Sequence, residues 1–428
     1  MSDWQQVSIG DLEAPVHRQA AVPPQGSRTS MSDGYPLRSL GEVMRIDIQR
    51  TPMKPATTYR LAGVLNAGKG VVAKGEIDGE DTEYAAMNVL RADQVVMRKL
   101  TAWEGPITVV PAEFDGFVVS NEFPTFTLGP DLTPDWMRHL CRSPRLWAEM
   151  KSRVSGTVQR RKRLNPEQLL QIQLPIPPRE VQARIVEVLD AVDDQVAALD
   201  TEADALQNVL RRRRADSLTE IPAVEVRADE AFSIMMGRQR SPQRATGPHM
   251  TPYLRSANVG YGTLDLSDVL EMDFNPGERE TFGLRYGDVL VSEGSASETA
   301  VGMPAMWRDE IPAPVCFQNT LLRYRAIQGV SISAFVNHWC LWAYESGKFR
   351  DVAGGTNIKH IGSRRAVQMR VRLPNVTDQA RIVTELDSMS EVIATTRAEA
   401  ACLREVRAAL LAGLLDRTID IGSVESEV

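Results

Sequence analysis

The strongest constraint on this chain is that it repeats itself at a separation of about 200 residues. Gln182–Asp190 reads QARIVEVLD and Gln379–Asp387 reads QARIVTELD, so seven of the nine positions are identical. Weaker matches precede this pair in the same order, and they join Tyr59 to Tyr253, Asp93 to Asp288, Ser155 to Gly354, and Ile176 to Leu373. A period this long exceeds that of solenoid repeats. Each copy is therefore expected to be a whole domain with an appendage.

The appendage of each copy is a long segment with helical periodicity. Apolar residues recur every three or four positions, which predicts a helix of about 35–40 residues within each of the segments 179–220 and 375–417, roughly 55–60 Å long at 1.5 Å per residue. The positions predicted to form the apolar seams are Ile185, Leu189, Val192, Val196, Leu199 and Leu206 in the first helix and Ile382, Leu386, Met389, Ile393, Leu403, Val406 and Leu410 in the second. Such a narrow stripe is typical of a coiled coil, so we expect the helices to pair antiparallel and to dock partners. The alternative is that each helix packs only on its own domain.

The rest of the chain forms two bodies, at 35–178 and 221–374. Both contain short runs rich in β-branched residues between Gly and Pro turns, and both place helical stretches late. The sequence thus predicts an α+β fold, with two similar globular α+β domains separated by two long antiparallel coiled-coil helices. Residues 1–34, rich in Pro, Gly, Ser and Gln, are expected to be an N-terminal tether, and 418–428 a flexible tail.

Motifs of catalysis and metal binding are missing from the sequence. It has neither a GxxxxGK[ST] phosphate loop nor a Gly-x-Ser-x-Gly elbow, and it lacks the Asp/Asn-Pro-Pro-aromatic motif of amino-methyltransferases. The five histidines lack HExxH or HxH spacing, and the four cysteines are scattered. We therefore expect no catalytic residue and no metal site.

Neither a signal peptide nor a membrane span is apparent. The first thirty residues have no continuous apolar core, and no stretch approaches the roughly 20 apolar residues that cross a bilayer. The expectation is a cytoplasmic protein.

Two basic patches lie at matched places in the repeat, although the chain has a formal net charge of −7. Each surrounds a Gly-Thr dipeptide, whose glycine lets backbone N–H groups approach a phosphate and whose threonine offers a hydroxyl. The candidate DNA-binding residues are Lys151, Arg153, Thr157, Arg160, Arg161, Lys162 and Arg163 in the first copy and Lys348, Arg350, Thr356, Asn357, Lys359, Arg364 and Arg365 in the second. The alternative is a solvated basic surface. Arg211–Arg214, on the first long helix, is expected to be an exposed face.

This organisation resembles the DNA-specificity subunits of type I restriction–modification systems. Those subunits carry two target recognition domains, each with a Gly-Thr segment, an I-P-x-P-P element, a glutamine and an Ile-Val-x-x-Leu-Asp helix start. The corresponding segments here are SGT at Ser155, LPIPPREVQARIVEVLD at Leu174, GGT at Gly354 and RLPNVTDQARIVTELD at Arg372. The second copy departs from the pattern at Asn375 and Val376, where prolines are usual, and at Asp378, where the family often has Glu.

The resemblance implies a subunit that is not itself an enzyme and that binds double-stranded DNA. Each domain would read one half of a split target, and the helices would set the spacing. Two methyltransferase (modification) subunits, which bind S-adenosylmethionine, would dock on the long helices, and two restriction (translocase) subunits using ATP and Mg can join them. The chain itself would bind no cofactor and no membrane. Two other functions stay open: a scaffold that displays two protein-binding domains without DNA, and a self-sufficient enzyme.

Overall fold

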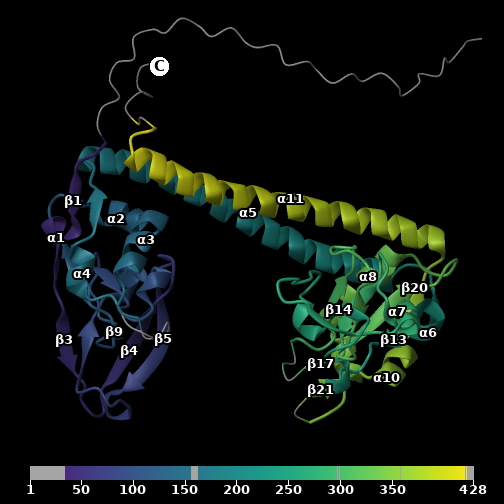
Figure 1. Ribbon diagram of the computed structural model, residues 1–428. Coiled ribbons are helices and arrows are strands. Elements are labelled where there is room, and N and C mark those ends of the chain that lie inside the picture. Colours follow the sequence, from purple (N-terminus) through teal and green to yellow (C-terminus); the bar gives the residue numbers. More distant parts are fainter. Residues whose placement is uncertain are drawn as a thin grey trace, which may run out of the picture. The chain divides into compact units, whose positions relative to one another are not determined.

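The chain folds into two compact units. The structure is a computed structural model that describes residues 34–155, 162–295, 297, 299–356, 358–419 and 421. Unit 1 contains the chain up to Leu189 together with the part from Ala408 onward, and unit 2 contains Asp190–Arg407. Each of the two long helices, α5 (Arg179–Thr219) and α11 (Val376–Leu415), therefore contributes to both units (Figure 1).

Unit 1 combines short strands with short helices. Its strands are β1 (Leu37–Ser39), β2 (Met44–Ile46), β3 (Gln49–Pro52), β4 (Thr58–Val64), β5 (Val71–Asp78), β6 (Ala86–Val89), β7 (Val95–Met97), β8 (Ile107–Val109), β9 (Val118–Val119), β10 (Thr125–Leu128) and β11 (Gln173–Pro175). Its shorter helices are α1 (Leu40–Val43), α2 (Pro134–Cys141), α3 (Pro144–Arg153) and α4 (Pro166–Leu170), with 3-10 turns at Gly79–Asp81, Ala102–Glu104 and Ala112–Phe114. The strands form a pair β1-β11, a four-stranded sheet β2-β10-β7-β8 and a five-stranded sheet β3-β6-β9-β4-β5.

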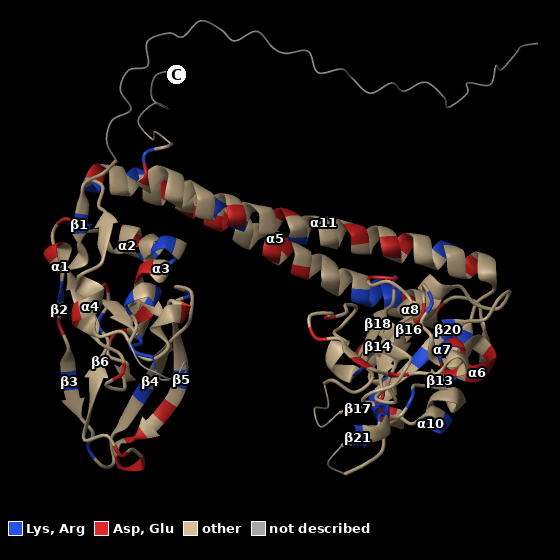
Figure 2. Ribbon diagram, viewed as in Figure 1, with Lys and Arg blue, Asp and Glu red and all other residues tan. Residues whose placement is uncertain are grey.

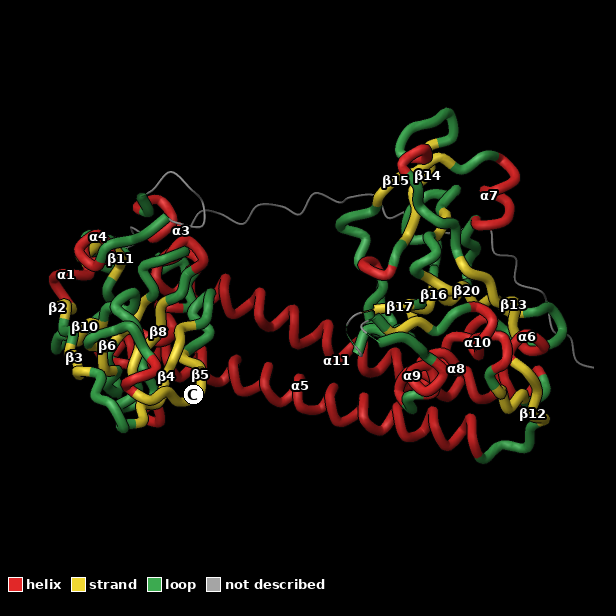
Figure 3. Tube along the Cα trace, turned by 90° about the horizontal axis from the view of Figure 1, so that it is seen from below, coloured by secondary structure: helices red, strands yellow, loops and turns green. Residues whose placement is uncertain are grey.

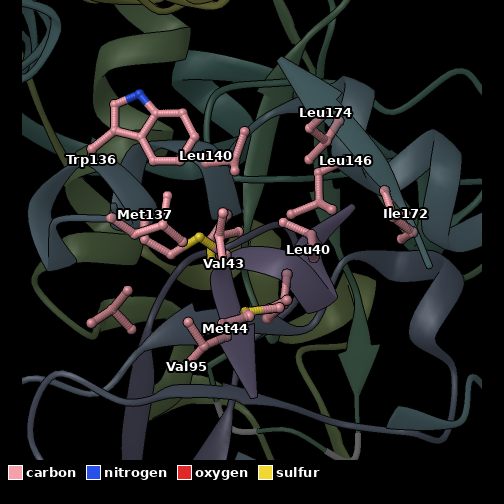
Figure 4. Close-up of a cluster of buried hydrophobic side chains, with 14 of the residues drawn as sticks. Leu40, Val43, Met44, Val95, Trp136, Met137, Leu140, Leu146, Ile172 and Leu174 are labelled. Atoms are coloured by element: carbon pink, nitrogen blue, oxygen red, sulfur yellow. The ribbon is translucent and has the colours of Figure 1, made fainter. Parts of the chain in front are cut away.

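The main core of unit 1 lies where α2 covers the four-stranded sheet. A proline at the first helical position and the side chain of Thr133, which accepts a hydrogen bond from the Trp136 N–H, begin α2. Figure 4 shows Trp136 and Met137 on the α2 side of this core, with Val43 and Met44 facing them. The first turns of α5 and the last turns of α11 join the same buried cluster, through Ile185, Leu189, Leu411, Leu414 and Leu415.

Unit 2 is built from a similar set of elements. Its strands are β12 (Val224–Arg227), β13 (Phe232–Met236), β14 (Met250–Leu254), β15 (Leu270–Asp273), β16 (Val289–Ser292), β17 (Gly294–Ser295), β18 (Pro304–Met306), β19 (Cys316–Phe317), β20 (Leu321–Ala326), β21 (Lys359–His360) and β22 (Arg370–Leu373). Its shorter helices are α6 (Ala228–Ala231), α7 (Pro276–Phe282), α8 (Ser333–Glu345), α9 (Lys348–Val352) and α10 (Ser363–Gln368), with 3-10 turns at Pro242–Arg244 and Ser256–Asn258. The sheets are β12-β22, β13-β20-β16-β18, β15-β14-β19 and β17-β21.

The two units share one topology. In each, the first strand pairs with the last (β1-β11 and β12-β22), a one-turn helix follows, and a four-stranded sheet has matching strand order. In each, one strand of the second sheet has an antiparallel neighbour and a parallel neighbour: β4 lies between β5 and β9, and β14 between β15 and β19. Figure 3 shows β14, β15 and α7 on one side of the four-stranded sheet of unit 2 and α8, α9 and α10 on the other. The predicted fold class, two similar α+β domains with paired long helices, is confirmed.

A buried glutamine begins each long helix. Gln182 and Gln379 are fully buried, and each side chain makes three hydrogen bonds to backbone atoms. Gln182 accepts from the N–H of Thr133 (3.0 Å) and donates to the C=O of Asp131 (2.7 Å) and Pro177 (2.9 Å); Gln379 accepts from the N–H of Ile332 (3.1 Å) and donates to the C=O of Val330 (2.9 Å) and Pro374 (2.9 Å). We call this arrangement the glutamine latch, because it ties the start of the long helix to the start of α2 or α8.

In unit 2 the two long helices lie side by side and antiparallel (Figure 1). Ion pairs join them, and residue numbers fall along α11 as they rise along α5: Asp193 to Arg407 (2.7 Å), Asp200 to Arg404, Asp204 to Arg397 (3.5 Å), and Arg213 to Glu385. The alternative, that each helix packs only on its own domain, is therefore wrong.

None of the described helices is long and apolar enough to cross a lipid bilayer.

The seam of the helix pair includes charged residues that the apolar pattern missed. Of the predicted seam positions, Ile185, Leu189, Val196, Leu199, Ile382, Leu386 and Ile393 are buried, and Val192, Leu206, Met389, Leu403 and Leu410 are half-buried. The prediction is wrong at Val406, whose side chain is 48% exposed, and the next residue, Arg407, is buried in its place. Its guanidinium can be buried because Asp193 of α5 pairs with it at 2.7 Å, while its alkyl stem covers apolar surface.

Candidate nucleic-acid interface

Each Gly-Thr segment is closed at its base by an antiparallel bridge. The bridge joins Ser155 to Arg163 in unit 1 and Gly354 to His360 in unit 2, with N–H to C=O distances of 2.9–3.0 Å in both directions. The described residues that flank the two segments are thus joined in the same way. Thr157, Arg160 and Arg161 of the first segment and Asn357 of the second lie outside the described residues.

Glu293 fixes the second Gly-Thr segment to the sheet. Its buried carboxylate pairs with His360 Nδ1 (2.8 Å) through one oxygen and accepts the Gly362 N–H (3.1 Å) through the other. Within the segment, Gly355 has φ +127°, and a Cβ there would lie 2.1 Å from the Ile358 carbonyl oxygen. Only glycine suits this backbone, which leaves Thr356 exposed at the surface of the loop.

The basic residues of unit 2 surround this segment, and Figure 2 shows Lys and Arg gathered near β17 and β21. Arg365 is used structurally, since it donates to the carbonyls of Ile361 (2.8 Å) and His360 (2.5 Å). Lys348 lies over the Trp342 ring at 5.2 Å, and Lys359 is half-buried on β21. Arg350 and Arg364 are exposed, and within the described part of the chain no acid pairs with them.

The basic residues of unit 1 are more strongly neutralised. Arg153 pairs with Glu149 one turn earlier on α3, and Arg163 pairs with Glu122 at 3.0 Å. Lys162 is half-buried, and its carbonyl accepts the Thr101 N–H at 3.1 Å. Lys151 is exposed and has no acidic partner among the residues described. Each unit therefore presents at least one unpaired cation beside its Gly-Thr segment.

Two cavities of unit 2 meet at Arg350. One, of about 370 Å³, includes Arg350 and Lys359 in its lining; the other, of about 440 Å³, includes Arg350, Arg211 and Tyr344. The walls carry three cations and the rings of Tyr261 and Tyr344, and the acids Glu345 and Asp351 also line them, so the surface has mixed charge with an excess of one cation. Arg211 had been expected only on an exposed helix face.

The expectation for Arg211–Arg214 is wrong at Arg214. The first three arginines are exposed, but Arg214 is buried, with its guanidinium 2.5 Å from Glu345 of α8. The Tyr261 hydroxyl donates to the same carboxylate, and burial, followed by that negative charge, raises the pKa of Tyr261. Arg214 therefore fixes α5 to α8 and is not available to an external ligand.

A buried histidine completes this junction. His338 of α8 bonds Asp387 of α11 through Nε2 at 2.9 Å, and Arg214 lies 3.4 Å from its Nδ1. Burial lowers the pKa of His338, and the hydrogen bond to Asp387 opposes this shift. The neutral ring is thus the form that this site stabilises.

Three of the four thiols, those of Cys141, Cys316 and Cys340, are buried and do not form a nucleophilic site, whereas Cys402 is exposed. Burial raises the pKa of Cys316 to about 12 and raises the pKa values of Cys141 and Cys340 well above the usual range. Because the thiolate is the reactive form, these side chains are inert packing groups at neutral pH. The arrangement of the two patches can bind an anion, whereas these thiols offer no covalent chemistry.

Comparison with a family model bears on the first patch. Residues 146–208 match the model described as the type I restriction modification DNA specificity domain. The matched stretch runs from α3 through the first Gly-Thr segment and Gln182 into α5. No curated protein sequence matches the chain.

Comparison with solved structures bears on the whole fold. The chain is similar, with a TM-score of 0.63 and 19% identity over 90% of its length and 98% of the other chain, to a structure described as the basis of complex assembly and conformational transition of the type I R-M system. The HsdS subunit from Thermoanaerobacter tengcongensis (TM-score 0.44, 19% identity) and the type-I S subunit from M. genitalium (0.45, 12%) each match 91% of this chain and 98% of theirs. The first of these structures shares the fold of this chain.

Proposed function

We propose that the chain is a non-catalytic DNA-specificity subunit of a type I restriction–modification system. The observation that carries this proposal is the duplication itself: each unit has one framework, one Gly-Thr segment and, among the described residues, at least one cation near that segment without an acidic partner. The family match at residues 146–208 supports it, since that stretch contains the first Gly-Thr segment, the basic residues around it and Gln182 at the start of α5. Because unit 2 has the same topology as unit 1, we assign the same role to the second copy.

Each unit reads one half of a split DNA target. Exposed cations such as Lys151 and Arg350 hold phosphates, which fixes the position of the unit on the duplex, while other side chains contact base edges in the major groove. Because α5 and α11 run through both units, their pairing sets the distance between the two half-sites. The overall negative charge of the chain is compatible with this function, because partner subunits supply further positive surface.

Catalysis belongs to the partners. Two methyltransferase subunits that carry S-adenosylmethionine dock on the long helices, and restriction subunits that use ATP and Mg can join them. The chain acts in the cytoplasm, where the DNA is, and it needs no cofactor of its own.

The test is co-purification followed by domain exchange. The full chain is expected to purify with a methyltransferase and to bind a duplex with two half-sites. Replacing unit 2 by that of another such subunit should change one half-site and leave the other unchanged. If both half-sites stay the same, the proposal fails. DNA binding that is weak and insensitive to salt would instead support a protein scaffold, because phosphate contacts make affinity fall steeply with salt.

The spacing role has a separate test. Inserting seven residues at matched points of α5 and α11 lengthens both helices by about 10 Å, at 1.5 Å per residue, and keeps the seam in register. The tolerated gap between half-sites should grow by about three base pairs, at about 3.4 Å each. An unchanged gap would show that the helices do not set the spacing.

A further inference from the structure

One arginine recurs at matched places just after the first strand of each four-stranded sheet. Residues 49–52 read Gln-Arg-Thr-Pro and residues 239–242 read Gln-Arg-Ser-Pro, so the two tetrapeptides differ by a single methyl group. The first forms β3 directly after β2, and the second lies in an irregular segment directly after β13; β2 and β13 hold the same position in the two four-stranded sheets. Arg50 and Arg240 are therefore counterparts.

A second arginine recurs just before the next strand of the same sheet. Arg91 lies four residues before the start of β7, and Arg285 lies four residues before the start of β16. Each follows a buried leucine, Leu90 or Leu284. The leucines pack in the core, which explains why both copies have them. The arginines are not in the core, so packing does not explain why both copies have an arginine at this position.

All four arginines are exposed, and the described part of the molecule gives none of them an acidic partner. Other exposed arginines of the same sheets are not shared by the copies. Arg45, the second residue of β2, has Ser233 at the same place in β13, and Arg308, two residues after β18, has Pro111 at the same place after β8. Since an exposed side chain adds little to stability, packing does not account for the shared arginines. A common ligand does.

The nature of that ligand follows from what the two units have in common, given the proposed function. The half-sites of a split target differ in their bases and share only the sugar–phosphate backbone. Residues that read bases should therefore differ between the units, and exposed residues that bind the backbone should be the same. We infer that Arg50, Arg91, Arg240 and Arg285 bind DNA phosphates, one pair in each half-site. The planar guanidinium suits this contact because it pairs with two phosphate oxygens at once.

The experiment measures salt dependence on two duplexes. The full chain, in the complex it forms with its methyltransferase, is titrated with a duplex carrying both half-sites and with one in which the bases of a single half-site are exchanged. Arg50→Ala should lower the slope of log affinity against log salt by about 0.9, the value for one phosphate contact. Relative to their affinities at 1 M salt, the variant should therefore bind about eightfold more weakly than the unsubstituted complex at 0.1 M salt. The loss should be equal on both duplexes, and Arg240→Ala, Arg91→Ala and Arg285→Ala should behave alike.

Matched variants decide the outcome. Arg50→Lys should keep the slope, because a lysine also binds a phosphate, and Arg45→Ala and Arg308→Ala should change affinity by less than about twofold. An Arg50→Ala loss confined to the duplex with its own half-site intact would show base reading and overturn the inference, as would an unchanged slope. If the unsubstituted complex binds no split duplex, the proposed function itself fails.

Discussion

Unit 1 and unit 2 agree most closely where they contact the long helices and differ most in the second sheet. The latch bonds of Gln182 and Gln379 match atom for atom, and the four-stranded sheets have the same order. The second sheet has five strands in unit 1 and three in unit 2. Helix α7 in unit 2 occupies the place in the sequence that strand β6 has in unit 1.

The difference separates a framework from a variable surface. The latch, the α2 and α8 helices and the four-stranded sheets hold each unit on α5 and α11, so both copies need the same contacts. The second sheet does not join these contacts and is free to change. The charges next to the Gly-Thr segments differ as well: Arg153 and Arg163 of unit 1 are paired with acids, whereas no acid in the described part of the chain pairs with Arg350 or Arg364 of unit 2. A variable surface on a fixed frame is what two different half-sites require.

The largest expected effect breaks the frame in unit 2 alone. Arg214→Met removes the buried guanidinium and leaves the Glu345 carboxylate without its 2.5 Å partner. Breaking one side of a buried pair costs about 3–5 kcal/mol, so the free energy of unfolding of unit 2 should fall by about that amount. Urea denaturation measures the loss, and hydrogen exchange should speed up in α8 and not in α2. Arg212→Met, at an exposed position two residues earlier on the same helix, is the control.

The next largest effect tests whether the latch is the same in both units. Gln182→Ala and Gln379→Ala each leave three backbone groups without a partner inside the protein, which should lower the free energy of unfolding by about 2–3 kcal/mol. The two losses should agree within about 1 kcal/mol, a difference that denaturation of the full chain resolves. Glu180→Ala, at an exposed position on the same turn of α5, should change stability by less than about 0.5 kcal/mol. A large loss in one unit only would show that the latches are not equivalent.

The frame was largely predictable from the sequence, because apolar periodicity and duplication report burial directly. Ile185, Leu189, Ile382 and Leu386 are buried as the three- and four-residue steps predict. Their positions follow from one rule, that a long helix hides its apolar stripe. The fold class and the antiparallel pairing follow from the same rule together with the intervening domain.

The buried polar groups were not predictable, because their burial depends on partners that are distant in the sequence. Arg407 looks like a surface residue until Asp193 is found beside it, and Arg214 looks like its exposed neighbours until Glu345 is placed. The duplicated Gln-Arg-Thr-Pro and Gln-Arg-Ser-Pro segments were visible in the sequence at a separation of 190 residues. That the two segments occupy matched positions became apparent only from the structure, which places them after the equivalent strands β2 and β13.

A pH dependence sharpens the comparison within unit 2. Burial holds the pKa of His338 below that of the unfolded chain, although Asp387 opposes the shift, and Arg214 and Glu345 also face the ring. The unfolded chain therefore binds this proton more readily. The contribution to stability is complete above the unfolded pKa of about 6.5 and decreases as the pH falls through it. Denaturation of the full chain at pH 8 and pH 5 should show a smaller loss for His338→Gln than for the unsubstituted chain. Equal losses would contradict the assignment.

The smallest expected effect concerns the two Gly-Thr segments. Arg350→Ala removes a cation that has no acidic partner among the described residues and should lower the steepness of the salt dependence of DNA binding by about 0.9, as loss of one phosphate contact does. Arg163→Ala should lower it by about half as much, because Glu122 at 3.0 Å already neutralises part of that charge and is released when the arginine is lost. Equilibrium titrations from 50 to 200 mM salt compare the variants on one duplex. If Arg163→Ala lowers the slope as much as Arg350→Ala, then Arg163 leaves Glu122 on binding, and the two segments meet the backbone in the same way despite their different charge pairing.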